Sequence, residues 1–226
     1  MHVIILAAGE SKRFKEAGYS IRKPWLQIEW RGTQSTMLNH VIDTVPLQFK
    51  DQITIAWPPG LNYVMSWPRS YDVGHTKGPA HTTLKMIEQI NPDSCLIMDS
   101  DILNFTNDLY ELTQLEEGCG VLVSSSADPS YSYVDSWLEF KRIAEKKRIS
   151  EFAVRGAYFV SKQAMPEFVS KLKSIVAEKD EPFISHVFDI MTCKKHSPIT
   201  SYTPINWGTP HDVELSGAKI VTERKN

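Results

Sequence analysis

A loop of small and basic residues follows the first apolar segment of the chain. Residues 3–8 are apolar, Gly9 breaks the run, and Arg13 follows shortly after. Small residues let backbone N–H groups approach a phosphate closely, and an arginine offers a planar fork of donors for phosphate oxygens. Lys23 adds a second positive charge. The pattern indicates phosphate binding, although it is neither a P-loop nor a GxGxxG motif. A plain turn with solvated basic side chains is the alternative.

Two carboxylates stand at the end of another short apolar run. Asp99 and Asp101 flank Ser100 directly after residues 95–98. Carboxylate oxygens suit Mg²⁺, which takes one or two of them and completes its octahedron with phosphate and water oxygens. The pair therefore indicates a cation site that carries a triphosphate. A turn or cap before a helix at 104–110 is the alternative interpretation.

The elements that precede these residues must position them. Short apolar runs predict strands, and amphipathic segments between them predict helices. The expected strands span residues 3–8, 53–57, 95–98, 121–123, 152–160 and 199–204, with Pro58-Pro59-Gly60 ending the second, and the expected helices span 36–45, 79–90, 163–176 and 183–191. This alternation predicts an α/β, three-layer, Rossmann-like fold with a mostly parallel mixed sheet and helices on both faces.

Ligands of open α/β sheets bind beyond the carboxyl ends of the strands. Gly9, Asp101 and the turn at 206–209 each follow an expected strand. We therefore expect them at one edge of the sheet.

The first loop resembles the signature of the nucleotidyltransferases that activate sugar phosphates, LAGGxGTRL followed by PK. It is also similar to the LAAG or LAGG openings of the related cytidylyltransferases and molybdopterin guanylyltransferases. The resemblance implies a GT-A-like form of the fold, a loop that wraps a nucleoside triphosphate (NTP), and catalytic roles for Arg13 and Lys23 at its phosphates. The implied nucleotide-binding residues of the loop are Leu6, Ala7, Ala8, Gly9, Glu10, Ser11 and Lys12. Ala8 and Ser11 stand where the family often has glycine.

The resemblance also implies a Mg²⁺ site. The family's metal aspartate corresponds to Asp101, and Asp99 lies beside the nucleotide. The segment Asn206-Trp207-Gly208-Thr209-Pro210 resembles the family turn that supplies the second ligand, often an aspartate. An amide oxygen also binds Mg²⁺. The sequence leaves open whether Asn206 or Asp212 completes the site, or whether the turn only caps a last helix.

Two further segments resemble family motifs. Glu145-Lys146, followed by a strand with Gly156 at its centre, is similar to the motifs that hold the sugar hydroxyls and the sugar phosphate. Lys147 replaces the usual proline, and a solvated charge run is the alternative. Gly78-Pro79 resembles the segment that reads the nucleobase, although Gly-Pro also simply begins helices.

The composition sets limits on the function. Hydrophobic residues make up 42% of the 226 residues, which predicts a folded globular chain. The net charge of −2 argues against a generic nucleic-acid binder, and no apolar run approaches the roughly 20 residues that span a bilayer. The start of the chain lacks a basic leader, so we expect a cytoplasmic protein. The three cysteines, without a CxxC pair, are expected to be small core residues.

We therefore expect one domain over residues 1–226, with a nucleotide-binding part at 1–124 and an acceptor-binding part at 125–226. The implied reaction transfers a nucleoside monophosphate from an NTP to a sugar 1-phosphate or similar phosphorylated acceptor, releasing pyrophosphate. A metal-dependent GT-A glycosyltransferase, suggested by the DxD at 99–101, and a non-catalytic nucleotide-binding relative are the alternatives. The sequence identifies neither the base nor the acceptor, and it leaves open whether the protein is a homo-oligomer.

Overall fold

The computed structural model describes residues 1–59 and 69–222, so Gly60 of the predicted strand-ending turn lies outside the described residues. The strands are β1 (His2–Leu6), β2 (Gln27–Trp30), β3 (Thr33–Thr36), β4 (Ile53–Trp57), β5 (Ser70–Asp72), β6 (Cys95–Asp99), β7 (Ile102–Leu103), β8 (Cys119–Ser125), β9 (Tyr133–Val134), β10 (Leu138–Glu139), β11 (Ile143–Ala144), β12 (Phe152–Val160), β13 (Lys195–Ser197), β14 (Ile205–Asn206) and β15 (Lys219–Ile220). The helices are α1 (Lys12–Glu16), α2 (Met37–Thr44), α3 (Pro79–Ile90), α4 (Thr106–Leu112), α5 (Met165–Glu178), α6 (Ile184–Ile190) and α7 (Pro210–Leu215).

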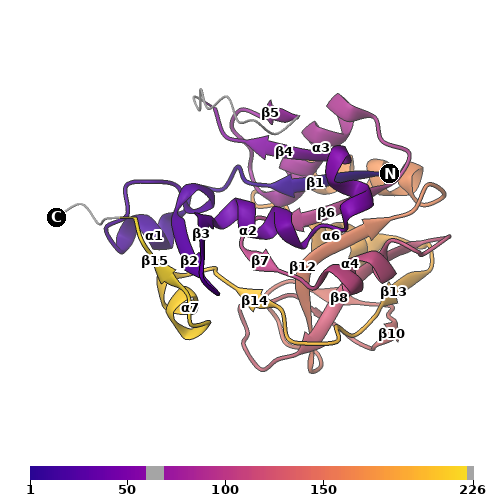
Figure 1. Ribbon diagram of the computed structural model, residues 1–226. Coiled ribbons are helices and arrows are strands. Elements are labelled where there is room, and N and C mark those ends of the chain that lie inside the picture. Colours follow the sequence, from indigo (N-terminus) through magenta and orange to yellow (C-terminus); the bar gives the residue numbers. More distant parts are fainter. Residues whose placement is uncertain (60–68, 223–226) are drawn as a thin grey trace.

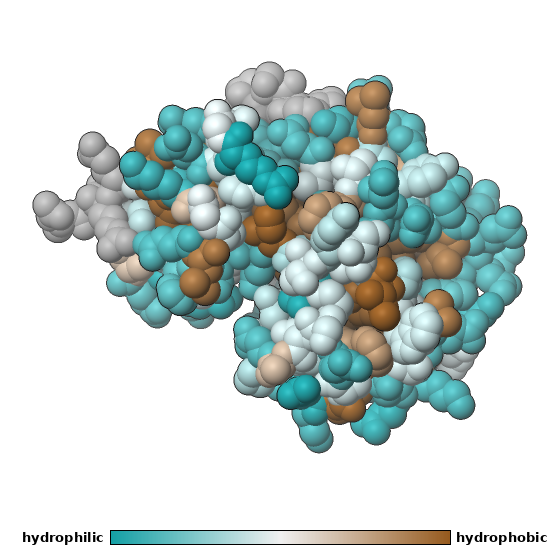
Figure 2. All heavy atoms as spheres, turned by 60° about the horizontal axis from the view of Figure 1, so that its bottom comes forward, coloured by the Kyte–Doolittle hydropathy of each residue, from teal (hydrophilic) through white to brown (hydrophobic). Residues whose placement is uncertain are grey.

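The main sheet is mixed. Its strand order is β10-β13-β8-β12-β6-β1-β4-β5, with β9 and β11 attached beside β12. β1 runs parallel to both β4 and β6, whereas β12 lies antiparallel between β6 and β8. A small sheet, β15-β2-β3, stands with α1 and α7 to the left in Figure 1, and the β8-β13-β10 edge lies to the lower right. In Figure 2 the surface is indented between these two parts.

Two apolar cores cover the two faces of the sheet. Successive residues of β1 point to opposite faces, so Ile4 belongs to one core while Val3 and Ile5 belong to the other. Helices α3, α5 and α6 pack on the Ile4 side, and α2 and α4 pack on the opposite side. The predicted three-layer α/β fold is confirmed.

One expected strand is wrong. Residues 199–204 form no strand, and Ile199 makes only an isolated bridge to Val123. The place beside β8 is taken instead by β13, which comes earlier in the chain. The N–H and hydroxyl of Ser201 donate to the carboxylate of Asp108 in α4, so this N–H is not used in strand pairing.

The hairpin of β2 and β3 was not predicted. Its two-residue turn, Arg31-Gly32, has positive φ at both positions, 50° and 76°. Such turns favour Asn or Gly at the first position, so an arginine there gives no turn signal. Cys95 and Cys119 are buried as expected, whereas Cys193 is partly exposed.

Candidate functional site

A cleft of about 1090 Å³ opens at the carboxyl ends of β1 and β6. The two strand ends are neighbours, because Leu6 pairs with Asp99 in the register of the sheet. The cleft is lined by nearly all the residues that the sequence analysis predicted: Leu6, Ala8, Gly9, Glu10, Ser11, Lys12, Arg13, Lys23, Gly78, Pro79, Asp99, Asp101, Glu145, Lys146, Gly156 and Asn206. The exception is Ala7. Its side chain is buried in the α2-side core, because alternate residues at the end of β1 face opposite ways.

The loop after β1 is fixed by Ser11. This residue has a φ of 58°, in the left-handed region that favours glycine, and it is the N-cap of α1. Its hydroxyl accepts a hydrogen bond from the backbone N–H of Lys23 at 2.8 Å. The serine that stands where relatives often have glycine therefore adopts a glycine-like conformation and ties the loop to Lys23. Arg13, in the first turn of α1, keeps an exposed side chain at the cleft.

Lys23 reaches the acidic end of β6. Its Nζ forms an ion pair with Oδ2 of Asp101. Burial raises the pKa of Asp99 to about 7; the negative charges of Asp101 and Glu145 act in the same direction, and Lys23 opposes them. Burial also raises the pKa of the Tyr158 phenol well above its ordinary value. The carboxyl of Asp99 and the phenol of Tyr158 thus lie in a buried corner of the cleft, where their charged forms are disfavoured.

Asn206 is brought to the same corner by its backbone. β14 pairs with β7, and the N–H of Trp207 donates to the carbonyl of Asp101 at 2.8 Å. Oδ1 of Asn206 accepts from the N–H of Gly208 at 2.9 Å. Asp212 does not line the cleft; its carboxylate accepts from the Thr209 hydroxyl at 2.7 Å. Of the two residues that the sequence left open, Asn206 faces the cleft and Asp212 belongs to the cap of α7.

The predicted acceptor residues also line the cleft. Oε2 of Glu145 accepts from the hydroxyls of Ser132 and, at 2.6 Å, of Ser185. Nζ of Lys146 lies 4.4 Å from the centre of the Phe183 ring. A cation over an aromatic face is stabilised by the ring quadrupole. Glu145 is therefore held by two hydroxyls, whereas Lys146 is exposed beside an aromatic ring.

Two glycines allow neighbouring segments of the cleft wall to pack closely, because a side chain at either position would collide with its surroundings. Gly156 has a φ of 58°, and a Cβ there would lie 2.6 Å from Oδ2 of Asp99. A Cβ on Gly78 would lie 2.8 Å from the carbonyl oxygen of Pro182. That carbonyl also accepts from the N–H of Ala80, so the start of α3 is tied to the segment before α6.

The donor set of this corner fits Mg²⁺. Asp101 and Asn206 line the cleft and offer the hard oxygen ligands that this cation prefers. Over residues 1–59 and 69–222, no group of three or more His, Cys, Asp or Glu side chains could hold a metal ion by itself.

The sequence analysis missed one wall of the cleft. The segment 128–132, with Tyr131 and Ser132, runs from Asn206 to Glu145, and Phe183 and Ser185 flank the acceptor residues. Serines and tyrosines in loops carry no motif, so no signal in the sequence pointed to them.

Comparisons with known proteins agree with this geometry. Residues 3–151 match the MobA-like NTP transferase domain family. Among curated proteins, no sequence matches the chain. A nucleoside-diphosphate-sugar pyrophosphorylase from Vibrio cholerae RC9 superposes with a TM-score of 0.73 at 17% identity, over 94% of this chain and 98% of that one.

Two UDP-glucose pyrophosphorylases have similar folds. One, whose structure is complexed with UDP-glucose, gives a TM-score of 0.72 at 15% identity over 96% of this chain and 97% of that one. The other, from Acinetobacter baumanii, gives 0.71 at 13% identity over 95% and 91%. The chain therefore belongs to the MobA-like NTP transferase family, and it is a nucleotidyltransferase.

Proposed function

We propose that the enzyme transfers a nucleoside monophosphate from an NTP to a phosphorylated small-molecule acceptor, with a sugar 1-phosphate as the first candidate. One observation carries the proposal: a single cleft is lined by Arg13, Lys23 and Asp101, which suit a nucleotide, and also by Glu145 and Lys146, which suit a phosphorylated acceptor. One cleft therefore offers groups for both substrates. A cytoplasmic location, where NTPs are supplied, is part of the proposal, and no helix among the described residues could cross a membrane.

The reaction is an in-line displacement at phosphorus. A phosphate oxygen of the acceptor attacks the α-phosphorus, the bond to the bridging oxygen of the β-phosphate breaks, and pyrophosphate leaves with the electron pair. Such a step needs positioned substrates and offset charge more than covalent help from the protein. Arg13 would bind the leaving phosphates, and Lys23, fixed through Asp101 and Ser11, would bind the reacting phosphate.

Asp101 and Asn206 would hold Mg²⁺. When bound, the cation neutralises charge on the triphosphate. Burial raises the pKa of Asp99 to about 7, and a bound cation would lower this pKa by stabilising the ionised carboxylate.

In acceptor binding, Lys146 would offset the acceptor phosphate. Oε2 of Glu145 is taken by Ser132 and Ser185, so its other oxygen is oriented to accept from acceptor hydroxyls. Gly156 lines the cleft beside these residues, and its lack of a side chain leaves room for the Asp99 carboxylate, with which a Cβ would collide. We assign nucleotide binding to residues 1–124 and acceptor binding mainly to 125–226 as part of this proposal.

A pyrophosphate-release assay with the four NTPs, Mg²⁺ and a panel of sugar 1-phosphates tests the proposal. Arg13→Ala should lower kcat by about 100-fold or more, which is the usual cost of losing one charged donor in a transition state. Lys15→Ala is the matched control, because Lys15 lies on the same short helix, is exposed, and does not line the cleft. An unchanged kcat for Arg13→Ala would show that the loop does not have the proposed role. Release of a free sugar from nucleotide-sugars, without pyrophosphate release from any NTP, would favour the glycosyltransferase alternative.

A further inference from the structure

The loop that carries Tyr131 contacts the predicted cation site through one hydrogen bond. Nδ2 of Asn206 donates to the phenol oxygen of Tyr131 at 2.7 Å. Both side chains line the cleft, and they come from segments far apart in the sequence. Tyr131 is thus in direct contact with a residue that would bind Mg²⁺.

Two contacts hold the Asn206 amide: the N–H of Gly208 decides which way it faces, and the hydroxyl of Tyr131 holds its nitrogen. Oδ1 accepts from the N–H of Gly208, and Nδ2 donates to Tyr131. A flipped amide would set its NH₂ group against the N–H of Gly208, two donors facing each other. The carbonyl oxygen therefore stays on the Gly208 side, where it keeps a second lone pair. A Cβ at position 208 would lie 3.1 Å from that oxygen, so a glycine keeps the space beside it open.

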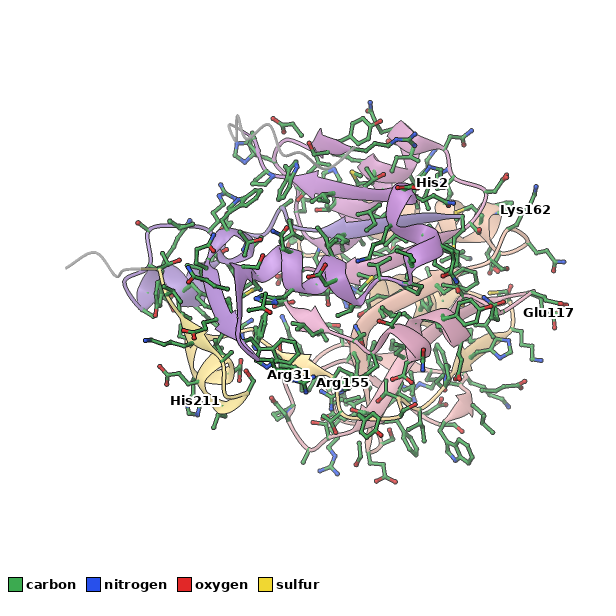
Figure 3. The ribbon with its side chains drawn as sticks, viewed as in Figure 1. His2, Arg31, Glu117, Arg155, Lys162 and His211 are labelled. Atoms are coloured by element: carbon green, nitrogen blue, oxygen red, sulfur yellow. The ribbon has the colours of Figure 1, made fainter. Side chains whose placement is uncertain are left out.

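Tyr131 is itself held by a buried arginine. The guanidinium carbon of Arg155 lies 4.4 Å from the centre of the Tyr131 ring. Arg155 donates from Nε to the Ser124 hydroxyl at 2.6 Å and from a terminal nitrogen to the Ser125 carbonyl at 3.2 Å. In Figure 3, Arg155 lies on the side of the molecule that carries Arg31, away from Glu117 and Lys162 at the other end of the sheet. The rigid strands β8 and β12 thereby determine where the phenol oxygen sits.

We propose that Tyr131 is a positioning residue: by accepting from Nδ2 it holds the Asn206 amide in the orientation that Gly208 selects, so that the amide oxygen faces the cation of the bound triphosphate. This inference rests on the proposed function. An aspartate at position 206 would present an oxygen on either side. An asparagine presents an oxygen on only one side, and so it needs a partner for its nitrogen.

The test uses Tyr131→Phe, which removes the hydroxyl and keeps the ring under Arg155. Binding of Mn²⁺, in place of Mg²⁺, is followed by water-proton relaxation in the presence of inorganic tripolyphosphate, the phosphate chain common to all NTPs. Removal of a group that orients a metal ligand typically weakens metal binding 10- to 100-fold. We expect Mn²⁺ affinity to fall about 10-fold, while tripolyphosphate binding without a cation stays unchanged. Tyr110→Phe, an exposed tyrosine of α4 outside the cleft, is the control and should change neither.

A second set of variants, built on Asn206→Asp, separates a positioning role of Tyr131 from a general structural effect. In Asn206→Asp protein, either carboxylate oxygen can face the cation, so adding Tyr131→Phe should change Mn²⁺ affinity less than about 2-fold. An equal loss in both backgrounds would show that the hydroxyl supports only the loop, and it would overturn the proposal. An unchanged affinity for Tyr131→Phe in the Asn206 background would overturn it as well.

Failure of this inference is distinguishable from failure of the proposed function. If Asn206→Ala weakens Mn²⁺ binding and Tyr131→Phe does not, only the positioning role is wrong. Two other results would contradict the metal assignment of the proposed function, and the positioning role would fail with it. One is that Asn206→Ala leaves Mn²⁺ binding unchanged. The other is that the protein does not change the water-proton relaxation of Mn²⁺ with tripolyphosphate.

Discussion

Single residues decide how closely the walls of the cleft approach each other. Gly156 is the sharpest case, because two separate effects act on it. Its φ of 58° disfavours any side chain, and a Cβ would lie 2.6 Å from Asp99 and 2.7 Å from Ile102. Gly32 shares only the first of these effects: its φ is 76°, and nothing lies within 4 Å of the position of a Cβ. The two glycines therefore separate backbone strain from collision.

Gly156→Ala should destabilise the protein by several kcal/mol, because about 1–2 kcal/mol of left-handed strain adds to overpacking of similar or larger size. Gly32→Ala should cost only the strain, about 1–2 kcal/mol. Urea unfolding of both variants, followed by fluorescence, measures the difference. Equal losses for the two variants would mean that Asp99 and Ile102 move aside without cost.

At the scale of elements, a carboxylate ties α5 to the chain that leads into β13. Glu167, in the first turn of α5, accepts from the N–H of Thr192 at 2.6 Å, from its hydroxyl at 2.8 Å and from the N–H of Cys193 at 3.1 Å. Burial by itself would raise the pKa of Glu167, but these hydrogen bonds prevail and the pKa is lowered. The ionised form therefore stabilises the fold.

Because the folded pKa of Glu167 lies below its unfolded value, its contribution is present at neutral pH and is lost as the pH falls through the folded pKa. Glu167→Gln should lower the Tm by a few degrees at pH 7. The difference from the wild type should shrink toward zero near pH 3. Thermal melts followed by circular dichroism at both pH values check this, with Glu178→Gln on the same helix as the control. A difference that is the same at both pH values would show that charge is not the cause.

At the scale of the molecule, the two predicted parts share one sheet. β12, from the second part, lies between β6 and β8, which lie wholly or mostly within the first. β8 in turn pairs with β13 from the second part. Neither part can bury its sheet faces without the other, so a functional division at residue 124 does not imply two folding units.

We therefore expect one cooperative unfolding transition. Calorimetry should give a single peak with a van't Hoff enthalpy equal to the calorimetric enthalpy. A fragment of residues 1–124 should lack the cooperative transition, because the edge of β6 that pairs with β12 would be exposed. Two separated peaks for the whole chain would contradict this view.

Much of the fold could be predicted because its signals are local. The apolar runs of β1 and β6 and the amphipathic pattern of α3 are set by neighbouring residues. The strand expected at 199–204 failed because Asp108, distant in sequence, binds Ser201. The β2-β3 hairpin was not predicted because Arg31 adopts a left-handed conformation, which an arginine does not indicate in a sequence.

The sequence by itself determined which residue types the proposed chemistry can use: a loop of small residues, carboxylates at a strand end, and basic residues at fixed spacings. These depend on residue type and on short distances along the chain, which one strand and one turn preserve. Only the tertiary structure decided which oxygen-bearing and which positively charged side chains line the same cleft. It placed Asn206 there and Asp212 in a helix cap, and it brought Tyr131 to Asn206. Those contacts join segments far apart in the chain, and only the pairing of strands in the sheets fixes their separation in space.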